Sequence, residues 1–350
     1  MNIIKVNASQ NYDIIIGSNL LHSIGGYFSK ILPSTSAVII SDTNVWPLYG
    51  ETVTKSLSRI GVNVVAFVFQ AGESSKNPEV YLKILNFLAE NQITRTDAII
   101  ALGGGVVGDM AGFVAATYLR GIAYIQVPTS LLAMVDSSVG GKTAIDLPAG
   151  KNLVGAFKQP QLVLCDIDTL TTLPTDVFLD GCAEIIKYGV LYDPQLVQYL
   201  LQSGPAFDRE FVIAKCVAFK RDVVQEDEFD RGSRQKLNFG HTIGHGIEAE
   251  SNFSVTHGRA VAAGMAIATK AAVAHGFCDK EVYTVLCALL AKFSLPSDTK
   301  LCAGNLYTSM LSDKKRSGNN ITLIIPKKLG LCDCVSTPIA ELHSFLKAGL

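Results

Sequence analysis

The sequence predicts a protein of the α/β + α class, with an amino-terminal α/β domain at residues 1–174 and a mainly helical domain at residues 175–350. Three observations predict this architecture. The first half contains short, continuous runs rich in Val and Ile, and the second half has apolar residues at helical spacing. The chain of 350 residues also exceeds the length at which one hydrophobic core usually stops growing. We expect the two domains to pack with a cleft between them that holds the active site.

The first half alternates strand-like and helix-like segments. Four apolar runs predict strands, and each is followed by Gly, Ser, Asp or Pro: residues 36–42, 63–69, 97–105 and 123–130. Because these runs are continuous and do not alternate with polar residues, we expect a mostly parallel, Rossmann-like sheet covered on both faces. Groups that bind ligands then belong at the carboxyl ends of the strands.

The second half is predicted to be helical beyond Leu173 and Pro174. Ala, Leu, Lys and Glu at helical spacing predict helices around Glu184 and at residues 195–202, 208–226, 237–250, 258–276 and 281–293. One strand-like run, residues 321–326, interrupts them. The sequence therefore predicts a mainly helical second domain.

Composition and charge exclude several classes of protein. Apolar residues make up 48% of the chain and charged residues 17%, which is typical of a globular protein. The net charge of −1 gives no basis for a nucleic-acid partner or an anionic membrane surface. The longest nearly uncharged stretch, residues 260–269, is far shorter than the roughly 20 apolar residues that cross a bilayer. We therefore expect neither a nucleic-acid nor a membrane partner.

The cysteines favour a cytoplasmic protein. Eight cysteines are scattered through mostly apolar segments without a Cys-x-x-Cys pair, and no amino-terminal signal segment is visible. Cys332 and Cys334 would point to opposite faces of an extended segment, which argues against a shared metal ion. We expect a reducing compartment.

A glycine-rich turn follows the third predicted strand. Gly103, Gly105 and Gly108 have G-x-G-x-x-G spacing between a strand and a helical stretch, where the backbone can approach a pyrophosphate. The alternative is merely a tight turn. Asp42, which ends an earlier strand, is a candidate for a ribose hydroxyl, although acidic residues after strands are common.

A second glycine-rich stretch carries Asp136, Lys142, Lys151 and Asn152. Lysines among glycines suit an anion held by ammonium groups and backbone amides, and the alternative is a solvated surface loop. Gly141-Lys142-Thr143 resembles the end of a P-loop, but Asp136 stands where that motif needs its first glycine. This mismatch excludes a P-loop nucleotide triphosphatase.

Three of the six histidines fall within 17 residues and predict a metal site. His241 and His245 are spaced i, i+4 and share a helix face, while His257 follows shortly afterwards. With Glu184 they make four candidate ligands, and a catalytic ion usually takes three protein ligands and keeps one position open. The alternative is a set of ordinary core histidines, which suits one of them better than three.

Further charged side chains lie close to these candidates. Glu184 and Lys187 are spaced i, i+3 in an apolar helical segment, where the alternative is a surface ion pair. Arg234 and Asn238 are in helical step with His241 and His245 and follow Lys220, so we expect one face to offer Arg and Asn to an anionic substrate.

In this order, the motifs LGGGVVGD, VPTSLLAMVDSSVGGKTAID, GKNLVGAF, AEIIKYG and LNFGHTIGHGIE resemble the 3-dehydroquinate synthase family from about Ser36 to Ile325. The resemblance implies an NAD-binding α/β domain, a helical domain with a divalent metal, usually zinc or cobalt, and a homodimer. It also implies conversion of 3-deoxy-arabino-heptulosonate 7-phosphate, a small anionic sugar phosphate, into 3-dehydroquinate and phosphate.

Carried over by motif, the resemblance implies three groups of site residues. The metal ligands would be Glu184, His241 and His257. NAD would contact Asp42, Glu73, Lys76, Gly103, Gly104, Gly105, Asp109, Thr129, Ser130, Lys142, Lys151, Thr169, Thr172 and Leu173. The substrate would contact Arg120, Asp136, Lys142, Asn152, Lys187, Lys220, Arg234, Asn238, His245 and one of Lys314 and Lys315.

Two positions depart from the family pattern. The family commonly has L-H-G-E around its last ligand, whereas this chain has Thr256-His257-Gly258-Arg259. Arg259 therefore replaces a negative with a positive charge two residues from an expected ligand. Asp230 stands where a longer Glu is frequent.

Three alternatives share parts of these patterns. A metal-dependent polyol dehydrogenase of the glycerol dehydrogenase type acts on neutral alcohols and would leave Lys142, Lys187, Lys220 and Arg234 without a function. Another sugar-phosphate cyclase, acting on a heptulose 7-phosphate, would not need residues for a substrate carboxylate. A non-catalytic relative would not need the full polar set.

Overall fold

The computed structural model describes residues 1–252, 254–311, 316–317 and 319–350, and the chain divides into two compact units. The first unit comprises Met1–Pro174 and Arg209–Phe229, and the second comprises Thr175–Asp208 and Asp230–Leu350. The first break between the units falls between Pro174 and Thr175. The segment Arg209–Phe229 differs, because it belongs to the first unit although the sequence places it in the helical domain.

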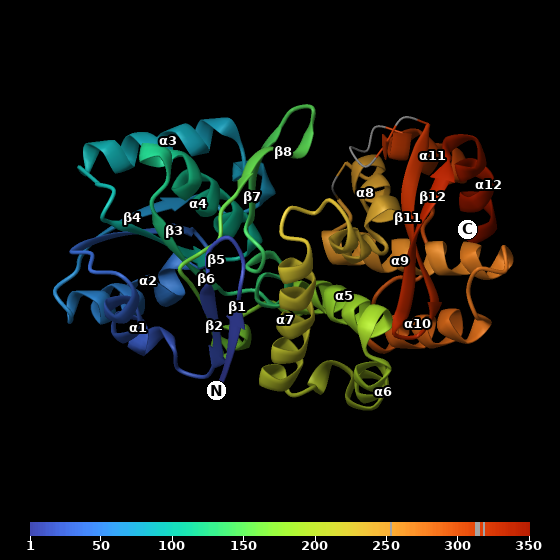
Figure 1. Ribbon diagram of the computed structural model, residues 1–350, viewed down its shortest axis with the longest axis horizontal. Helices are drawn as coiled ribbons and strands as arrows, with labels where there is room; N and C mark the ends of the chain where they lie inside the picture. The colour runs from blue at the N-terminus through green and yellow to red at the C-terminus, as the bar shows by residue number, and fades with distance from the viewer. Residues whose placement is uncertain (253, 312–315, 318) are drawn as a thin grey trace. The chain divides into compact units, whose positions relative to one another are not determined.

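The first unit contains a seven-stranded sheet in the order β1-β2-β9-β6-β5-β3-β4. Its strands are β1 (Asn2–Val6), β2 (Tyr12–Gly17), β3 (Ser36–Asp42), β4 (Asn63–Phe69), β5 (Ala98–Gly103), β6 (Ala123–Pro128) and β9 (Leu162–Asp166). Strands β1 to β6 of this sheet are labelled in Figure 1. Only β1 pairs antiparallel, with β2, and the other pairings are parallel. The mostly parallel sheet expected from the continuous apolar runs is confirmed.

Helices cover both faces of this sheet. The helices α1 (Ile24–Ile31) and α2 (Trp46–Ser58) share one hydrophobic core with the sheet, through side chains such as Phe28 and Leu57. The helices α3 (Pro78–Glu90) and α4 (Gly105–Thr117) share a second core, through side chains such as Leu88 and Met110. Because both faces are packed, the strands have apolar residues on both sides.

The chain reverses its direction of travel across the sheet at β3 and β5. From β3 it moves outward to β4, then returns to β5 on the other side of β3 and continues to β6 and β9. In sheets of this kind, ligands bind at the carboxyl ends of the strands beside such a switch point. The glycine-rich turn after β5 lies at this position.

Helix α7 (Arg209–Glu226) packs on the first unit because it contacts β1, β2 and the helical turn at Ala133–Ser137. Polar contacts join both ends of the segment Arg209–Phe229 to residues on either side of β1. The Met1 amino group lies 2.5 Å from Glu210 Oε1, and the Ser9 amide donates to Glu228 over 2.8 Å. A hairpin of β7 (Lys142–Leu147) and β8 (Gly150–Phe157) completes this unit.

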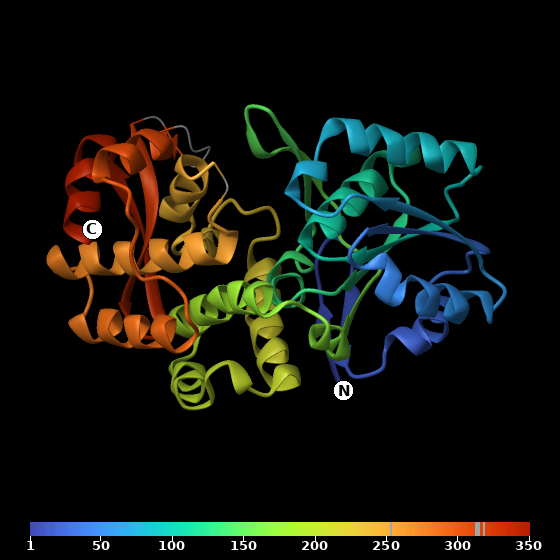
Figure 2. The same ribbon diagram turned by 180° about the vertical axis from the view of Figure 1, so that it is seen from behind.

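The second unit is built around a long buried helix. Its helices are α5 (Thr175–Tyr192), α6 (Pro194–Ser203), α8 (His241–Glu250), α9 (His257–Ala274), α10 (Lys280–Lys292), α11 (Ala303–Leu311) and α12 (Ile339–Gly349). Helix α9 contacts α5, α8, α10 and α12, and Figure 2 shows it in orange above α10. Ala and Gly make up much of its buried surface, which allows its neighbours to pack closely.

The second unit also contains a three-stranded antiparallel sheet of β10 (Arg316–Ser317), β11 (Asn320–Lys328) and β12 (Leu331–Pro338). The sequence predicts only the middle strand. Cys332 is buried and Cys334 is exposed on β12, so they point to opposite faces as expected. Among the described residues, no helix is both long and apolar enough to span a membrane.

Candidate functional site

Helix α5 carries a buried charge pair in the second unit. Glu184 is 0% exposed and Lys187 is 1% exposed, and the Lys187 ammonium forms an ion pair with Glu184 Oε2. The spacing of i, i+3 brings the two side chains together as the sequence predicts. Because both are buried, the pair is not a surface ion pair. A buried carboxylate of this kind needs positive charge around it.

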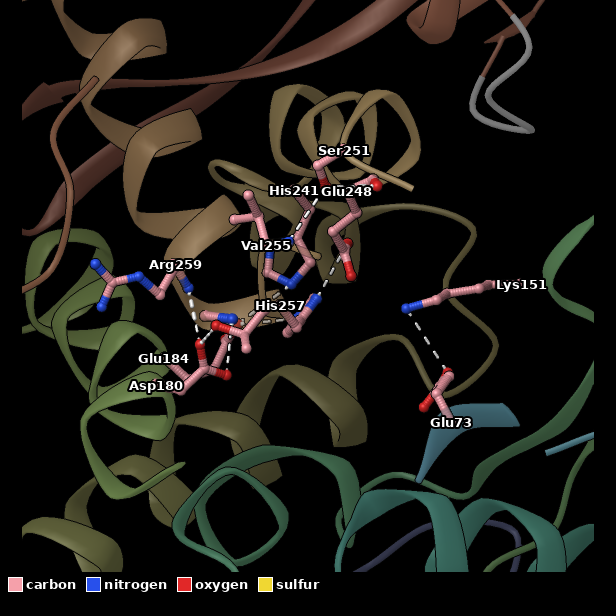
Figure 3. Close-up of polar contacts among 12 residues, drawn as sticks. Glu73, Lys151, Asp180, Glu184, His241, Glu248, Ser251, Val255, His257 and Arg259 are labelled. Atoms are coloured by element: carbon pink, nitrogen blue, oxygen red, sulfur yellow. Dashed lines mark hydrogen bonds and ion pairs between the residues drawn. The ribbon is translucent and has the colours of Figure 1, made fainter. Parts of the chain in front are cut away.

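Two histidines face the same carboxylate from other helices. His241 begins α8, and its Nε2 lies 3.4 Å from Glu184 Oε1. His257 begins α9, and its Nε2 lies 3.6 Å from the same oxygen. One ligand atom from each of the three residues lies within 4.8 Å of the others (Figure 3). Glu184 precedes His241 by 57 positions and His257 by 73, and the fold brings the three residues together in an arrangement that suits a three-ligand metal site.

Glu248 also belongs to this cluster, although the sequence does not reveal it. It is 3% exposed, and its Oε2 lies 3.4 Å from Nδ1 of His257 (Figure 3). A metal-ligating histidine commonly uses its second nitrogen in this way. Burial alone would lower the pKa of His257, but the carboxylates of Glu184 and Glu248 raise it to about 10. The surroundings of this imidazole therefore favour a cation.

His245 lies beside this cluster. Its ring centroid is 5.7 Å from that of His241 and 6.1 Å from that of His257. His245 forms a second candidate ligand group with Glu248 and His257. The two groups share His257, so one ion at Glu184 leaves His245 available for another function.

The prediction that Arg234 and Asn238 share a helix face with His241 and His245 is wrong. Arg234 and Asn238 lie on a separate 3₁₀ helix, Ser233–Asn238, and α8 begins only at His241. Gly240 interrupts the helix with a left-handed φ of 77°, and a Cβ there would lie 2.6 Å from the Val261 carbonyl oxygen. Arg234 is nevertheless 2% exposed, which is unusual for a guanidinium without a specific function.

In the first unit, the expected cofactor residues lie at the carboxyl ends of adjacent strands. Gly103 ends β5, Gly105 begins α4, and the Thr129 amide after β6 donates to the Gly103 carbonyl over 2.9 Å. Ser130 follows Thr129, and Gly104 lies between the other two glycines. The expected strand, turn and helix around the G-x-G-x-x-G spacing are therefore present.

Asp42, at the end of the adjacent β3, also has a local structural function. Its Oδ1 accepts hydrogen bonds from the amides of Asn44 and Val45, both over 2.9 Å. This carboxylate oxygen therefore stabilises the turn that leads to α2.

A polar cluster surrounds Lys76. This lysine is 4% exposed, and its Nζ lies 2.6 Å from Asp109 Oδ2 and 2.5 Å from Asn152 Oδ1. Glu73 Oε1 lies 3.9 Å from Lys76 Nζ. It also lies 3.8 Å from Lys151 Nζ (Figure 3). Burial lowers the pKa of Lys76, but Asp109 and Glu73 outweigh it and raise the pKa overall.

Asp146 belongs to the same cluster, although the sequence analysis does not identify it. Its amide donates to the Lys76 carbonyl and its carboxylate accepts from the Asn152 amide, both over 2.8 Å. Lys142, Lys151 and Asn152 of the segment expected to bind an anion therefore lie on a regular hairpin, of which Lys142 is exposed to solvent.

Another ion pair in the first unit joins Asp136 to α7. Lys220 is 6% exposed, and its Nζ lies 2.9 Å from Asp136 Oδ1 and 2.6 Å from the Asp136 carbonyl oxygen. Lys142 is exposed at the start of β7, and Arg120 is exposed with a left-handed φ of 69°. The structure therefore joins Lys220 to Asp136, and no contact of Arg120 with another described candidate is seen.

The remaining candidates follow β9. The Tyr49 hydroxyl lies 2.5 Å from Thr172 Oγ1 and donates to the Thr169 carbonyl over 3.2 Å. Thr169 is buried and Leu173 is half-buried. Lys314 and Lys315 lie outside the described residues.

Comparison with known proteins identifies the family. The family model for the 3-dehydroquinate synthase N-terminal domain matches residues 66–180, and the model for the C-terminal domain matches residues 181–316. The 3-dehydroquinate synthase of Streptococcus thermophilus is 41% identical, over 98% of this chain and 99% of that protein. The 3-dehydroquinate synthase of Clostridium kluyveri is 42% identical, over 99% of this chain and 98% of that protein.

Solved structures of related enzymes share the fold. A crystal structure of 2-deoxy-scyllo-inosose synthase with carbaglucose-6-phosphate, NAD+ and Co2+ is 25% identical and has a TM-score of 0.90 over 100% of both chains. Glycerol dehydrogenase from Schizosaccharomyces pombe is 18% identical and has a TM-score of 0.68, over 96% of this chain and 88% of that chain. On the two family models and the full-length sequence similarity, the chain belongs to the 3-dehydroquinate synthase family.

Proposed function

We propose that this protein is a 3-dehydroquinate synthase, which converts 3-deoxy-D-arabino-heptulosonate 7-phosphate into 3-dehydroquinate and phosphate in the shikimate pathway. The observation that carries the proposal is the buried Glu184 carboxylate facing His241 and His257. It is found in a chain that is 41% identical over nearly its whole length to a protein of that name. The more general conclusion is an enzyme of the sugar-phosphate cyclase type.

The donor set of the second unit fits a divalent ion. One carboxylate oxygen and two imidazole nitrogens are ligands that Zn2+ and Co2+ accept, and three protein ligands leave a position open. The related 2-deoxy-scyllo-inosose synthase was crystallised with Co2+. We infer that Glu184, His241 and His257 hold the ion and that Glu248 orients His257.

The first unit fits NAD, which the same related structure contains. The glycine-rich turn between β5 and α4 lies beside the switch point of the sheet, where dinucleotides bind in this class of fold. We infer that NAD contacts the turn Gly103–Gly105, with Asp42, Thr129 and Ser130 at the neighbouring strand ends. The remaining NAD contacts are assigned to Glu73, Lys76, Asp109, Lys142, Lys151, Thr169, Thr172 and Leu173.

When bound, the two cofactors supply a reversible hydride acceptor and Lewis-acid polarisation of the substrate oxygens. The side chains of the chain bind and orient the substrate. We assign the phosphate to Lys142, Asn152, Arg120 and Lys187, because cationic and amide donors form strong hydrogen bonds to it. After the substrate is oxidised, loss of the neighbouring proton releases phosphate by β-elimination. The hydride then returns to the same carbon, so there is no net oxidation, and intramolecular aldol closure forms the ring.

Two buried cations suit the substrate carboxylate. Lys220 is 6% exposed and Arg234 is 2% exposed, and cationic side chains held in place by burial form strong, directional hydrogen bonds to a carboxylate. Asp136 is paired with Lys220 and keeps this ammonium in place. We assign the hydroxyl contacts and proton transfer to Asn238 and His245.

A phosphate-release assay tests the proposal. The purified protein with NAD and Co2+ is expected to release phosphate from 3-deoxy-D-arabino-heptulosonate 7-phosphate and to accumulate no NADH. Excess chelator is expected to stop the release, and added Co2+ to restore it. Phosphate release from glucose 6-phosphate, but not from 3-deoxy-D-arabino-heptulosonate 7-phosphate, would favour another cyclase. NADH accumulation with glycerol would favour a polyol dehydrogenase.

The family resemblance also supports a carbon–oxygen lyase that is homodimeric and cytoplasmic. Sedimentation of the purified protein would test the dimer, for which the expected mass is twice that of the chain.

A further inference from the structure

We propose that Asp180 is a positioning residue that holds the metal ligand His257 in front of Glu184. This inference rests on the metal site of the proposed function. Asp180 lies one helical turn before Glu184 on α5, and the two side chains share a helix face. One face of α5 thus provides a metal ligand and, on this proposal, the residue that positions another ligand.

The Asp180 carboxylate accepts hydrogen bonds from the first turn of α9 (Figure 3). Its Oδ2 accepts from the Gly258 amide over 3.0 Å, and its Oδ1 accepts from the Arg259 amide over 2.9 Å. The Thr256 hydroxyl donates to the same Oδ1. Three donors around the first residue of α9 are therefore satisfied by one side chain from a different helix.

The first turn of α9 lacks a carboxylate of its own. Thr256 stands at the N-cap position, but its side chain makes no capping hydrogen bond, and the turn has no acidic residue. Arg259 occupies the third helical position, where a Glu would complete a capping box with Thr256. A positive charge there is unfavourable to the helix dipole. The carboxylate that the family pattern supplies from the position of Arg259 is thus supplied here by Asp180.

The packing around Gly258 makes this contact specific. A Cβ at Gly258 would lie 1.9 Å from the Asp180 carbonyl oxygen, so the amino terminus of α9 lies directly against the α5 backbone. His257 is the residue immediately before this contact. Its Nε2 and Nδ1 lie 3.6 Å and 3.4 Å from Glu184 and Glu248, respectively. Loss of the cap would allow the first turn of α9 to fray and would release His257 from this position.

Titration of the metal-free protein with Co2+ tests the inference without a measurement of turnover. Affinity is obtained by competition with a chromophoric chelator, and ligand geometry from the visible spectrum of bound Co2+. Residues that orient a ligand typically contribute about 10- to 100-fold to metal affinity, so we expect a loss of this size in Asp180→Ala, with an altered spectrum. Asp180→Asn keeps the side-chain shape and one acceptor oxygen, and it is expected to show a smaller loss even if Asp180→Ala does not fold.

Two further variants separate positioning of the ligand from general helix stability. Asp193 caps α6 through the amides of Gln195 and Leu196, over 2.9 and 3.1 Å, and α6 carries no proposed ligand. Asp193→Ala is therefore expected to keep wild-type Co2+ affinity. In Asp180→Ala/Arg259→Glu, a capping box with Thr256 is restored, and we expect most of the lost affinity to return.

The possible outcomes are distinguishable. Wild-type Co2+ affinity in both Asp180→Ala and Asp180→Asn would overturn the inference and leave the proposed function intact. If the wild-type protein bound no Co2+, the metal site of the proposed function would be wrong, and the inference with it.

Discussion

At the residue scale, Lys187 is a buried cation for which we propose a contact with the substrate phosphate. It forms an ion pair with Glu184, and both side chains are almost completely buried. A bound divalent ion would compensate Glu184 when this lysine is removed, so we expect metal-loaded Lys187→Ala to keep its melting temperature within a few degrees. We expect turnover to fall about 100-fold or more, as for other lost electrostatic contacts to a reacting group. Calorimetry and initial rates measure the two effects.

Lys83 provides the matched control for Lys187. It forms an exposed ion pair with Glu79, 2.6 Å away on α3. Exposed pairs contribute only about 0–1 kcal/mol, so Lys83→Ala should change neither turnover nor melting. A near wild-type rate in Lys187→Ala would contradict the proposed function of this lysine.

His241 and His245 form a second pair of variants. We expect His241→Ala to be folded but to lose its metal, because His241 faces Glu184. We expect His245→Ala to retain its metal and to lose about 100-fold in turnover, as for a group that transfers protons. Metal content after dialysis and rates with added metal measure both effects. The opposite pattern would exchange the functions assigned to these two histidines.

The sequence predicts the residues of the metal cluster better than the residues that support them. Three closely spaced histidines and a Glu in an apolar helix are unusual, and the structure brings Glu184, His241 and His257 together. Glu248 follows His245 by three residues, but an acidic residue on a helix is common and only its burial distinguishes it. Asp180 could not be identified, because its partners lie more than 70 residues later in the chain.

At the scale of elements, Gly240 determines where α8 begins. Its left-handed φ is unfavourable to other residues, and a Cβ would lie 2.4 Å from Met265 Cγ and 2.6 Å from the Val261 carbonyl oxygen. We expect Gly240→Ala to destabilise the protein by about 3 kcal/mol or more, from backbone strain and overpacking together. Urea denaturation of the whole protein measures the loss in the free energy of unfolding.

A variant at Gly276 distinguishes backbone strain from overpacking. Gly276 also has a left-handed φ, 74°, but a Cβ added there would meet no atom within 4 Å. We expect Gly276→Ala to cost about 1 kcal/mol from the backbone alone. Equal losses in the two variants would show that packing against α9 does not determine the start of α8.

The elements that the sequence predicts best are the long or strongly apolar ones. The strands at residues 36–42 and 63–69 and the helices at residues 195–202, 208–226, 258–276 and 281–293 begin and end within two residues of prediction, whereas α11 and α12 are not predicted. Strand β9 is only five residues long, too short to show a period, and the sequence analysis does not identify it. The helix predicted at residues 237–250 begins only at His241. Gly240 fits the spacing of apolar residues in the sequence, but its left-handed φ of 77° cannot be part of a right-handed helix.

At the scale of the whole molecule, the proposed NAD and metal residues fall in different units. All proposed NAD residues lie in Met1–Pro174, and all three metal ligands lie in the second unit. We therefore expect His241→Ala to bind NAD with an affinity within about threefold of wild type, since this substitution changes none of the proposed NAD residues. Isothermal titration with NAD measures this affinity. A loss of NAD binding together with the metal would contradict the separate assignment.

The division into units could be predicted only in part. The change from Val- and Ile-rich runs to helical spacing marks the boundary after Pro174. The return of α7 to the first unit depends on its contacts with β1 and β2, about 200 residues earlier in the chain. A helical pattern indicates that a helix forms, but it does not indicate which sheet or helices the helix packs against.

The position of the bound ion tests most directly whether Glu184, His241 and His257 are the metal ligands. In a crystal of the cobalt-loaded protein, anomalous scattering is predicted to show one peak, about 2.0–2.2 Å from an oxygen of Glu184 and from one nitrogen each of His241 and His257. A peak among His245, Glu248 and His257, or no peak near Glu184, would contradict the assignment of Glu184, His241 and His257 as the ligands.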